Sequence, residues 1–341
     1  MSLRLAFAGT GYISRIHATA AQNLSGVQLV AVVNHQPESM AAFAKGFDIP
    51  RQYATIEEML AEGGVDAISI NTPNYLHAPQ TIAALGAGVH AMVEKPMALD
   101  AKQAQSMVAA SESSGALLMV AHCWRFDPEV LWVKEQVHDG RIGDVIRTKG
   151  YGVHVNWGPR GWFTQNKLAG GGALADMGIH AIDTARFLLS DPRPISVYAQ
   201  IGTYYTDFDI DDTGVIIVNW DTGVTSYIES GWWQPHADGP EASTQLYGTK
   251  GMAHLYPTGL KVHRTLEGQG TPANVDPGFP PVRDPHCPQS MYDAQMANFV
   301  DCIKKGRTPV PGGAEGLVNM RIVDAAYESS RTGRAVDVDQ R

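Results

Sequence analysis

Residues 3–14, Leu3-Arg4-Leu5-Ala6-Phe7-Ala8-Gly9-Thr10-Gly11-Tyr12-Ile13-Ser14, decide the fold of the first part of the chain. The apolar run at 3–8 predicts a buried strand, and a helix-like segment follows from Ile13 to Leu24. A glycine-containing turn between a strand and a helix is typical of a βαβ unit. The stretch therefore predicts the start of an α/β fold.

Three small residues in this turn match the GxGxxG/A fingerprint of dinucleotide-binding folds: Gly9, Gly11 and Ser14. The first glycine allows a tight turn, the second lets a pyrophosphate approach the backbone, and the small third residue lets helix and strand pack closely. The amides of Tyr12 and Ile13, at the helix N-terminus, would then face the phosphates. An ordinary strand–helix turn is the alternative, and the position inside a βαβ unit favours the dinucleotide site.

The same alternation continues to about residue 120. Further apolar runs predict strands at 27–33, 67–70, 89–93 and 117–120, and helix-like segments lie at 37–45, 56–61, 76–87 and 101–114. Alternating strands and helices with short connections predict a doubly wound parallel sheet that is covered on both faces. We assign residues 1–122 to this dinucleotide-binding Rossmann domain.

After Ala121 the pattern changes to grouped strands, which predict a largely antiparallel α+β domain at residues 123–341. We expect this domain to bind the substrate and to form the oligomer contact. Its expected strands are 145–154, 195–201, 215–220, 224–230 and 244–247, and its closing helices are 292–305 and 316–330. The Pro- and Gly-rich segment Gly268–Pro288 is expected to be a long surface loop, either a lid or an interface loop.

The composition narrows the class of protein. The net charge is −9 and there is no long basic run, so neither a nucleic acid nor an anionic membrane is expected as a partner. The three cysteines are widely separated, which fits a reducing compartment and predicts neither disulfides nor a zinc site. The apolar N-terminal run is too short for a signal sequence or a membrane span. We expect a cytoplasmic protein.

The end of the second strand bears on the choice of dinucleotide. An acidic residue that binds the adenosine ribose is usual about 20 residues past the glycines, but Asn34 and His35 stand here. A carboxylate would repel a 2′-phosphate, whereas Asn34 can hydrogen-bond either a hydroxyl or a phosphate. Both residues are candidate cofactor ligands, and the cofactor can be NAD or NADP.

Three further residues carry the chemistry. Lys95, in Glu94-Lys95-Pro96, follows a predicted strand and so lies at the carboxyl edge of the sheet, where ligands bind in doubly wound folds. Asp176 and His180 follow the triple glycine at 170–172 and are four residues apart, so that in a helix they share one face. A lysine, an aspartate and a histidine beside a nicotinamide can carry alcohol oxidation. Taken singly, each also fits a structural role.

Together these segments resemble the glucose–fructose oxidoreductase/inositol dehydrogenase (Gfo/Idh/MocA) family over nearly the whole chain. The matching stretches are Gly9–Ser14, Thr72-Pro73-Asn74-Tyr75-Leu76-His77, Glu94-Lys95-Pro96, Arg125-Phe126-Asp127-Pro128, 170–180 with Asp183, Tyr247-Gly248-Thr249-Lys250-Gly251 and Ala325-Ala326-Tyr327-Glu328-Ser329. The resemblance implies a Rossmann domain followed by a large, mostly antiparallel open sheet. One face of that sheet often forms a subunit interface, so a homodimer or homotetramer is expected.

The resemblance also implies the roles of particular residues. Thr72, Pro73 and Asn74 would lie near the nicotinamide, and His77 and Glu94 join the expected cofactor-binding set. Lys95 would contact cofactor and substrate, and Asp176 and His180 would form the catalytic pair. Two departures stand out: Asn34 replaces the usual acid, and Trp162-Phe163 stands where many relatives carry Trp-Arg.

These residues indicate an NAD(P)-dependent oxidoreductase that moves hydride between the nicotinamide and a secondary hydroxyl of a sugar, polyol or sugar derivative. His180 would accept the hydroxyl proton and Lys95 would stabilise the alkoxide. Asp176 would hold the substrate or the imidazole in place. The alternatives are an NAD-retaining glycoside hydrolase that uses transient oxidation and a non-catalytic regulator that senses sugar or dinucleotide.

The substrate is expected to meet aromatic and polar side chains of the second domain, because aromatic faces suit the C–H faces of sugars. The expected ligands are Arg125, Tyr151, His154 and Trp162, and further candidates are Trp157, Trp232, Trp233 and His236. Neighbours on a strand point to opposite faces, so at most one of Trp232 and Trp233 should face the pocket. No metal is expected.

Overall fold

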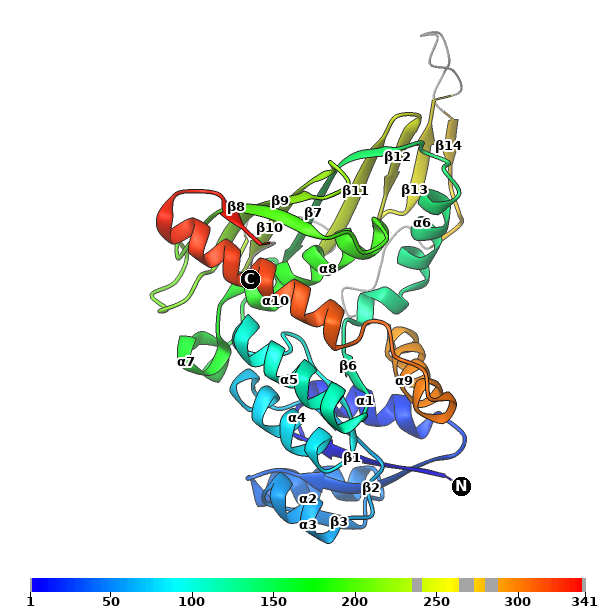
Figure 1. The fold of residues 1–341 in the computed structure, drawn as a ribbon, viewed down its shortest axis with the longest axis vertical. Coiled ribbons are helices and arrows are strands. Elements are labelled where there is room, and N and C mark those ends of the chain that lie inside the picture. Colours follow the sequence, from blue (N-terminus) through cyan, green and yellow to red (C-terminus); the bar gives the residue numbers. More distant parts are fainter. Residues whose placement is uncertain (1, 235–240, 264–272, 280–287, 339–341) are drawn as a thin grey trace. The chain divides into compact units, whose positions relative to one another are not determined.

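The computed structural model describes residues 2–234, 241–263, 273–279 and 288–338 (Figure 1). The chain forms two compact units, one of Met1–Cys123 with Pro288–Met320 and one of Trp124–Cys287 with Arg321–Arg341. The first transition lies one residue from the boundary that we expected at residue 122. The return of Pro288–Met320 to the first unit was not part of our two-segment expectation.

The first unit is built on a six-stranded parallel sheet in the order β3-β2-β1-β4-β5-β6. Its strands are β1 (Leu3–Ala8), β2 (Val27–Val33), β3 (Arg51–Tyr53), β4 (Ala67–Ile70), β5 (His90–Val93) and β6 (Leu118–Val120). Five of them were expected, and the predicted α/β class is confirmed. β3 was missed because Arg-Gln-Tyr contains no apolar run, so only its pairing with β2 makes it a strand.

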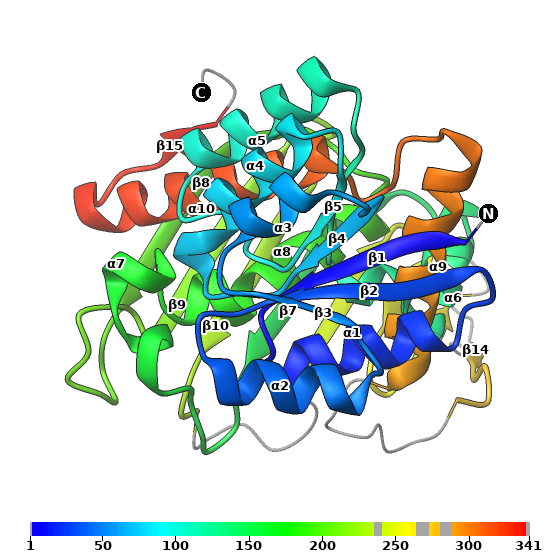
Figure 2. The same cartoon turned by 90° about the horizontal axis from the view of Figure 1, so that it is seen from below.

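Helices cover both faces of this sheet (Figure 2). They are α1 (Tyr12–Gln22), α2 (Pro37–Gly46), α3 (Ile56–Glu62), η1 (Asn74–Leu76), α4 (His77–Gly86), α5 (Ala101–Ser114) and α9 (Gln289–Lys305). Local signals set several boundaries. The Thr55 side chain and Glu58 form a capping box at α3, and Gly115 ends α5 in the left-handed conformation. Helix α9 packs against α1, which explains why this late segment belongs to the first unit.

The strand order reverses between β1 and β4, so the connections after these two strands leave in opposite directions. Ligands in doubly wound folds bind at the carboxyl ends of the strands at such a reversal. The glycine turn follows β1, Asn34 follows β2, residues 71–74 follow β4 and Lys95 follows β5. The topology therefore gathers the expected cofactor residues at one edge of the sheet.

The second unit contains a nine-stranded sheet in the order β14-β13-β12-β11-β7-β10-β9-β8-β15. Among the strands that the structure describes, β7 and β10 alone pair in parallel, which confirms the mostly antiparallel sheet. The strands are β7 (Val145–Val153), β8 (Pro194–Gly202), β9 (Thr213–Trp220), β10 (Thr225–Gly231), β11 (Ala242–Gly248), β12 (Gly251–His254), β13 (Gly259–Val262), β14 (Ala273–Val275) and β15 (Val336–Asp337).

The segment expected to be a surface loop, Gly268–Pro288, is described in part. Strand β14 lies within it and pairs with β13, so this part of the expectation was wrong. The strand was missed because its three residues, Ala-Asn-Val, alternate too briefly to give a signal. Residues 268–272 and 280–287, on which the prediction of a lid or an interface loop mainly rests, lie outside the described residues.

One face of the second sheet carries the helices of this unit. They are η2 (Cys123–Phe126), α6 (Pro128–His138), η3 (Gly161–Thr164), α7 (Asn166–Ala169), the π-helical turn η4 (Leu174–Gly178), α8 (Ile179–Leu188) and the last part of α10 (Gly313–Thr332). η4 and α8 pack on β7 and β10. A Cβ added to Gly152 would lie 2.2 Å from the carbonyl oxygen of Met177, so glycine lets η4 approach β7 this closely.

No helix among the described residues is both long and apolar enough to cross a lipid bilayer.

Candidate functional site

The glycine turn has the geometry that a dinucleotide requires. Gly9 has φ +92°, and a Cβ added there would lie 2.5 Å from the carbonyl oxygen of Asn71, so the fold itself demands glycine at this position. Gly11 differs, because its φ of −71° suits any residue and no heavy atom of the described residues lies within 4 Å of an added Cβ. The space at Gly11 is therefore available to a ligand.

Neighbouring groups fit the same ligand. Ser14 is fully buried where α1 meets the sheet, which matches the close packing expected of the third small residue. The first turn of α1, from Tyr12 to Arg15, contains no acid that would repel a phosphate. Asn71 is 8% exposed, and its Nδ2 has no acceptor among the described residues. An unsatisfied buried donor beside the turn suits a polar ligand.

These observations make a paired prediction. Gly11→Ala should fold with a stability within about 0.5 kcal/mol of the parent, because the backbone and the space tolerate a methyl group. It should weaken NAD(P)H binding at least about tenfold, a loss of about 1.4 kcal/mol. Gly9→Ala should instead lower the free energy of unfolding by at least about 2 kcal/mol, because alanine is strained at a positive φ and its methyl group would clash with the Asn71 carbonyl oxygen. Urea unfolding and NAD(P)H fluorescence titration measure the two effects, and equal dinucleotide affinity of Gly11→Ala and the parent would contradict the assignment.

Asn34 and His35 occupy the expected position after β2. The Asn34 side chain donates to the Thr10 hydroxyl in the glycine turn, and its Oδ1 accepts weakly from the backbone N–H of Gln36 at 3.4 Å. His35 is exposed. The Thr10 hydroxyl also lies 2.7 Å from that of Ser39 in α2. Asn34 is thus linked to the loop on which the pyrophosphate is expected, and it remains neutral.

His77 bridges the ends of β4 and β5. Its Nε2 lies 2.7 Å from the carbonyl oxygen of Thr72 and its Nδ1 lies 2.8 Å from that of Pro96. Burial lowers the pKa of His77, and the two carbonyls and Glu94 only partly offset this. His77 belongs to the predicted cofactor-binding set. The geometry supports an indirect role, in which the ring fixes the two loops.

Glu94 is also held within the protein. Its Oε1 lies 3.1 Å from Nε2 of His17 in α1, and its Oε2 accepts from the backbone N–H of Lys95 at 3.2 Å. Burial alone would raise the pKa of Glu94, but the hydrogen bond and charge of His17 and the charges of Lys95 and His77 lower it. The carboxylate therefore fixes the backbone at Lys95 and links it to His17 of α1.

The catalytic candidates are divided between the two units. Lys95 belongs to the first, at the carboxyl end of β5, and Asp176 and His180 belong to the second. The predicted helix at Asp176 and His180 is present, but Asp176 lies in the π-helical turn η4 and His180 in the first turn of α8. π-Helical turns are rare in proteins, and those that occur often lie at functional sites. His180 is 7% exposed and stacks on Trp124, with ring centroids 4.7 Å apart.

Contacts with Asp211 and Tyr327 explain why glycines stand before Asp176, and these contacts could not be read from the sequence. The backbone N–H groups of Gly172 and Leu174 each donate to the buried Asp211 carboxylate at 2.8 Å, and the Tyr327 hydroxyl donates to it at 2.7 Å. An added Cβ would lie 1.8 Å from the Asp211 carbonyl oxygen at Gly172 and 2.2 Å from the Tyr327 hydroxyl at Gly171. Asp211 therefore anchors the start of the turn that carries Asp176.

His154 and Trp232 both reach the Asp176 carboxylate. The indole N–H of Trp232 donates to its Oδ2 at 3.0 Å, and Nε2 of His154 lies 3.5 Å from the same oxygen. Trp232 is fully buried, and of the two adjacent tryptophans it is the one that contacts Asp176. The other nitrogen of His154 lies 3.0 Å from Glu241. His154 thus lies beside Asp176, and its predicted contact with the substrate stays a prediction.

Tyr151 lies on the other face of the sheet. Gly152 faces Met177 of η4, and Tyr151, one residue earlier on β7, must point away from it. Tyr151 pairs with Glu229 on β10, a neighbour that, together with burial, raises the pKa of its hydroxyl. The geometry therefore does not support Tyr151 as a substrate ligand. The spacing of three between Tyr151 and His154 indicated that at most one of them faces the site, and only the packing of η4 on β7 shows that it is not Tyr151.

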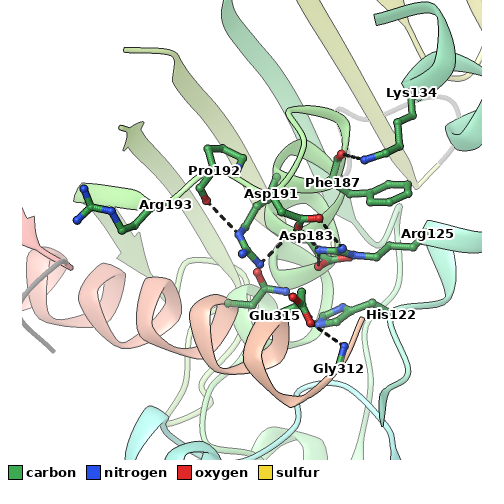
Figure 3. A network of polar contacts seen from close by, with 12 residues as sticks. His122, Arg125, Lys134, Asp183, Phe187, Asp191, Pro192, Arg193, Gly312 and Glu315 are labelled. Atoms are coloured by element: carbon green, nitrogen blue, oxygen red, sulfur yellow. Dashed lines mark hydrogen bonds and ion pairs between the residues drawn. The ribbon is translucent and has the colours of Figure 1, made fainter. Parts of the chain in front are cut away.

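Arg125 is committed to a buried ionic network (Figure 3). Its Nε and Nη2 donate to the two oxygens of Asp183 at 2.8 and 2.7 Å, and its Nη1 and Nη2 donate to Asp191 at 3.1 and 2.7 Å. Burial lowers the pKa of Arg125, but the two carboxylates outweigh it and raise that pKa. The guanidinium also lies over the Phe187 ring. Arg125 is therefore part of the buried core of the unit, and the geometry does not support the prediction that it binds the substrate.

The remaining candidates have mixed surroundings. Trp162, in η3, is half-buried and stacks on Phe163 with ring centroids 3.8 Å apart. Trp157 is 46% exposed and stacks on His154 at 3.6 Å. His236 lies outside the described residues. Within the described parts of the chain, no cluster of three or more His, Cys, Asp or Glu side chains could hold a metal ion.

The fold and these groups are those of an oxidoreductase with a dinucleotide-binding domain and a second domain that contains Asp176 and His180. The model of an oxidoreductase family with an NAD-binding Rossmann fold (GFO_IDH_MocA) matches residues 3–122, and the C-terminal domain model of the same family matches residues 130–254. The chain therefore belongs to the Gfo/Idh/MocA family of oxidoreductases.

Relatives with assigned activities align over nearly their full length. The chain is 30% identical to D-xylose 1-dehydrogenase (NADP(+)) 2 of Haloferax volcanii, with 98% of each chain covered. It is 28% identical to inositol 2-dehydrogenase of Rhizobium meliloti, covering 99% of this chain and 100% of the relative. It is 27% identical to 1,5-anhydro-D-fructose reductase of Ensifer adhaerens, with 97% of each chain covered. These three names describe dehydrogenases and a reductase, and none describes a regulator or a glycoside hydrolase.

Solved structures agree with the fold. The aldose–aldose oxidoreductase of Caulobacter crescentus, crystallised with glycerol, is 29% identical with a TM-score of 0.84, covering 99% of this chain and 100% of that one. Levoglucosan dehydrogenase, crystallised with NADH and levoglucosan, has a TM-score of 0.88 at 23% identity over the full length of both chains, a likeness that concerns the fold alone.

Proposed function

We propose that this protein transfers hydride between the nicotinamide of NAD or NADP and a secondary hydroxyl or ketone of a sugar, a polyol or a sugar derivative. The observation that carries the proposal is the Asp176–His180 pair. The two residues lie on consecutive helical turns, and Asp176 is contacted by Trp232 and His154. The family relatives named above act on hydroxylated substrates, which supports the substrate class.

The first unit would hold the dinucleotide. The N-terminal amides of α1, at Tyr12 and Ile13, and the open space at Gly11 suit the pyrophosphate. Asn34, His35 and the segment Thr72-Pro73-Asn74 are proposed to contact the rest of the cofactor. The nicotinamide accepts or donates the hydride when it is bound. Lys95 would contact both cofactor and substrate from the carboxyl end of β5.

The protein side of the reaction is an acid–base step. During oxidation, His180 would take the proton of the reacting hydroxyl while hydride leaves the same carbon. Lys95 would stabilise the negative charge that develops on the oxygen, and its own charge would favour the neutral imidazole. Asp176 would orient the hydroxyl through a hydrogen bond. In reduction, His180 would return the proton to the carbonyl oxygen.

The test is the appearance of reduced cofactor, followed by absorbance, across a panel of aldoses, ketoses, inositols and anhydrosugars with NAD and with NADP. Turnover with at least one sugar or polyol is expected. Tight dinucleotide binding without turnover on any member of the panel, in either direction, would refute the proposal and favour a regulator or an NAD-retaining hydrolase.

Asn34 offers a prediction about cofactor choice. Asn34→Asp should lower the affinity for NADP at least about tenfold relative to NAD, because the carboxylate repels the 2′-phosphate and accepts from the ribose hydroxyls. The ratio of kcat/KM for the two cofactors measures the effect. Glu38→Gln, at an exposed acid in the first turn of α2, is a control in the same region. An unchanged ratio in Asn34→Asp would exclude Asn34 from the adenosine ribose site.

The open face of the second sheet is the proposed oligomer contact. The residues at one register level across β8, β9, β10 and β7 are Tyr198, Ile217, Tyr227 and Lys149. Tyr198 is 42% exposed, and the row mixes aromatic, aliphatic and charged groups as interfaces do. We propose that the protein is a homodimer or a homotetramer and that it is cytoplasmic. Light scattering of the purified protein should give two or four times the mass of one chain.

A further inference from the structure

Glu241, a residue that sequence reasoning missed, is linked to Asp176 through His154. The two side chains are 87 positions apart, and Nδ1 of His154 lies 3.0 Å from Oε2 of Glu241. The other nitrogen, Nε2, faces Oδ2 of Asp176 at 3.5 Å. One imidazole therefore lies between two carboxylates, and each ring nitrogen has its own acceptor. A neutral imidazole can donate to only one of them, whereas imidazolium donates to both.

Other contacts hold this arrangement in place. Oε1 of Glu241 accepts from the indole N–H of Trp157 at 2.5 Å and from the backbone N–H of Val155 at 3.3 Å. The Trp157 ring stacks on the His154 ring, with centroids 3.6 Å apart. The backbone N–H of His154 donates to the carbonyl oxygen of Gly231 at 2.8 Å. Glu241 and Trp157 therefore fix both the position and the rotation of the imidazole.

The electrostatics agree with this geometry. Burial alone would lower the pKa of His154, but contacts with Asp176 from η4 and with Glu241, directly before β11, raise it. Burial would likewise raise the pKa of Glu241, and His154 and Trp157 lower it. Among the residues of the unit that the structure describes, these two carboxylates are the charged groups that act on His154. Both favour the charged ring.

We propose that Glu241 is a positioning residue that holds His154 as an imidazolium against Asp176, and so fixes the orientation of the Asp176 carboxylate toward the reacting hydroxyl. This inference rests on the proposed function for the part played by Asp176. Loss of the charge on His154 would weaken one of the contacts that orient the Asp176 carboxylate, and the hydrogen bond from the Trp232 indole N–H would remain. Hydride transfer would then fall although the dinucleotide still binds.

The kinetic test is the pH dependence of kcat/KM for the best substrate of the panel. In the parent, the basic limb should lie above the ordinary histidine pKa of about 6.5, because the contacts with Asp176 and Glu241 raise the pKa of His154. Glu241→Gln removes the carboxylate, and the basic limb should move down by about one pH unit or more. At pH values above both limbs kcat/KM should fall about tenfold relative to the parent, which is the fold-change of a one-unit shift, and the ratio of variant to parent should return toward one at lower pH, with KM for the dinucleotide unchanged. A purely structural effect would lower kcat at every pH and leave the limb in place, and that result overturns the proposal.

Two further variants complete the design. Glu135→Gln makes the same substitution at an exposed position of α6 in the same unit, and it should leave the profile unchanged. His154→Gln should abolish the limb that we assign to His154, which keeps the test decisive if Glu241→Gln does not fold. A basic limb identical in His154→Gln and the parent overturns the assignment.

A second readout does not depend on activity. The His154 imidazole can be titrated by NMR in the full-length protein, with His154→Gln to assign its signal. The midpoint should lie above about 6.5 in the parent and at least about one pH unit lower in Glu241→Gln. Equal midpoints would overturn the link between Glu241 and His154. A parent that oxidises no substrate but shows the expected midpoints would refute the proposed function and leave this link standing.

Discussion

His180→Ala is expected to lower kcat/KM for sugar or polyol oxidation by about 10²–10⁴-fold, the usual contribution of a positioned general base. His180 lies on the first turn of α8, directly after the turn that carries Asp176, and stacks on Trp124. Its removal takes away the proposed acceptor of the hydroxyl proton but no group of the proposed dinucleotide site. The dissociation constant of NADH or NADPH should therefore stay within about twofold of the parent.

The comparison needs controls for folding and for histidine loss in general. His138→Ala, at an exposed position at the end of α6, should keep full activity. Lys95→Ala should lower kcat/KM by a similar factor to His180→Ala, because the positive charge of Lys95 would no longer stabilise the developing alkoxide. Circular dichroism and thermal unfolding should show that both catalytic variants fold. Near-normal turnover of His180→Ala at neutral pH would remove His180 from the mechanism.

Arg125→Ala is expected to lower the free energy of unfolding by about 3–5 kcal/mol, because it leaves Asp183 buried without its cation. The Arg125 and Asp183 side chains are each 2% exposed, and the two groups are joined by two parallel hydrogen bonds. The Asp191 carboxylate would lose its contact as well. Urea denaturation, monitored by tryptophan fluorescence, measures the change.

The matched comparison is an exposed pair in the same unit. Arg193 and Asp221 lie 3.6 Å apart with side chains 55% and 36% exposed, and such a pair contributes at most about 1 kcal/mol. Arg193→Ala should therefore barely move the urea midpoint. If Arg125→Ala kept its stability but raised KM for the sugar, Arg125 would be a substrate ligand, as the sequence first suggested.

The two predictions separate residues that looked alike in the sequence. Arg125 and His180 both lie in stretches that match the family, and both were expected to face the substrate. The structure pairs Arg125 with the carboxylates of Asp183 and Asp191, which lie 58 and 66 positions away. Such partners cannot be read from local spacing, because the fold alone brings them together. His180 lies one helical turn from Asp176, a relation that local spacing does encode.

The sequence by itself determined the features that depend on near neighbours. Five strands of the first sheet follow from apolar runs, and the cofactor turn follows from Gly9 and Gly11 after β1, because these signals act over a few residues. The two-part architecture and the family also followed from motifs in order. The pairing of Asp176 with His180 required only a helical spacing.

Only the tertiary structure decided the features that depend on distant partners. It brought Pro288–Met320 back to the first unit through the packing of α9 on α1, and it placed Tyr151 on the open face of the sheet. It also brought Glu241 to His154 and Asp211 to the glycines before Asp176. The physical reason is that hydrogen bonds and packing act over a few ångströms in space, whatever the separation along the chain.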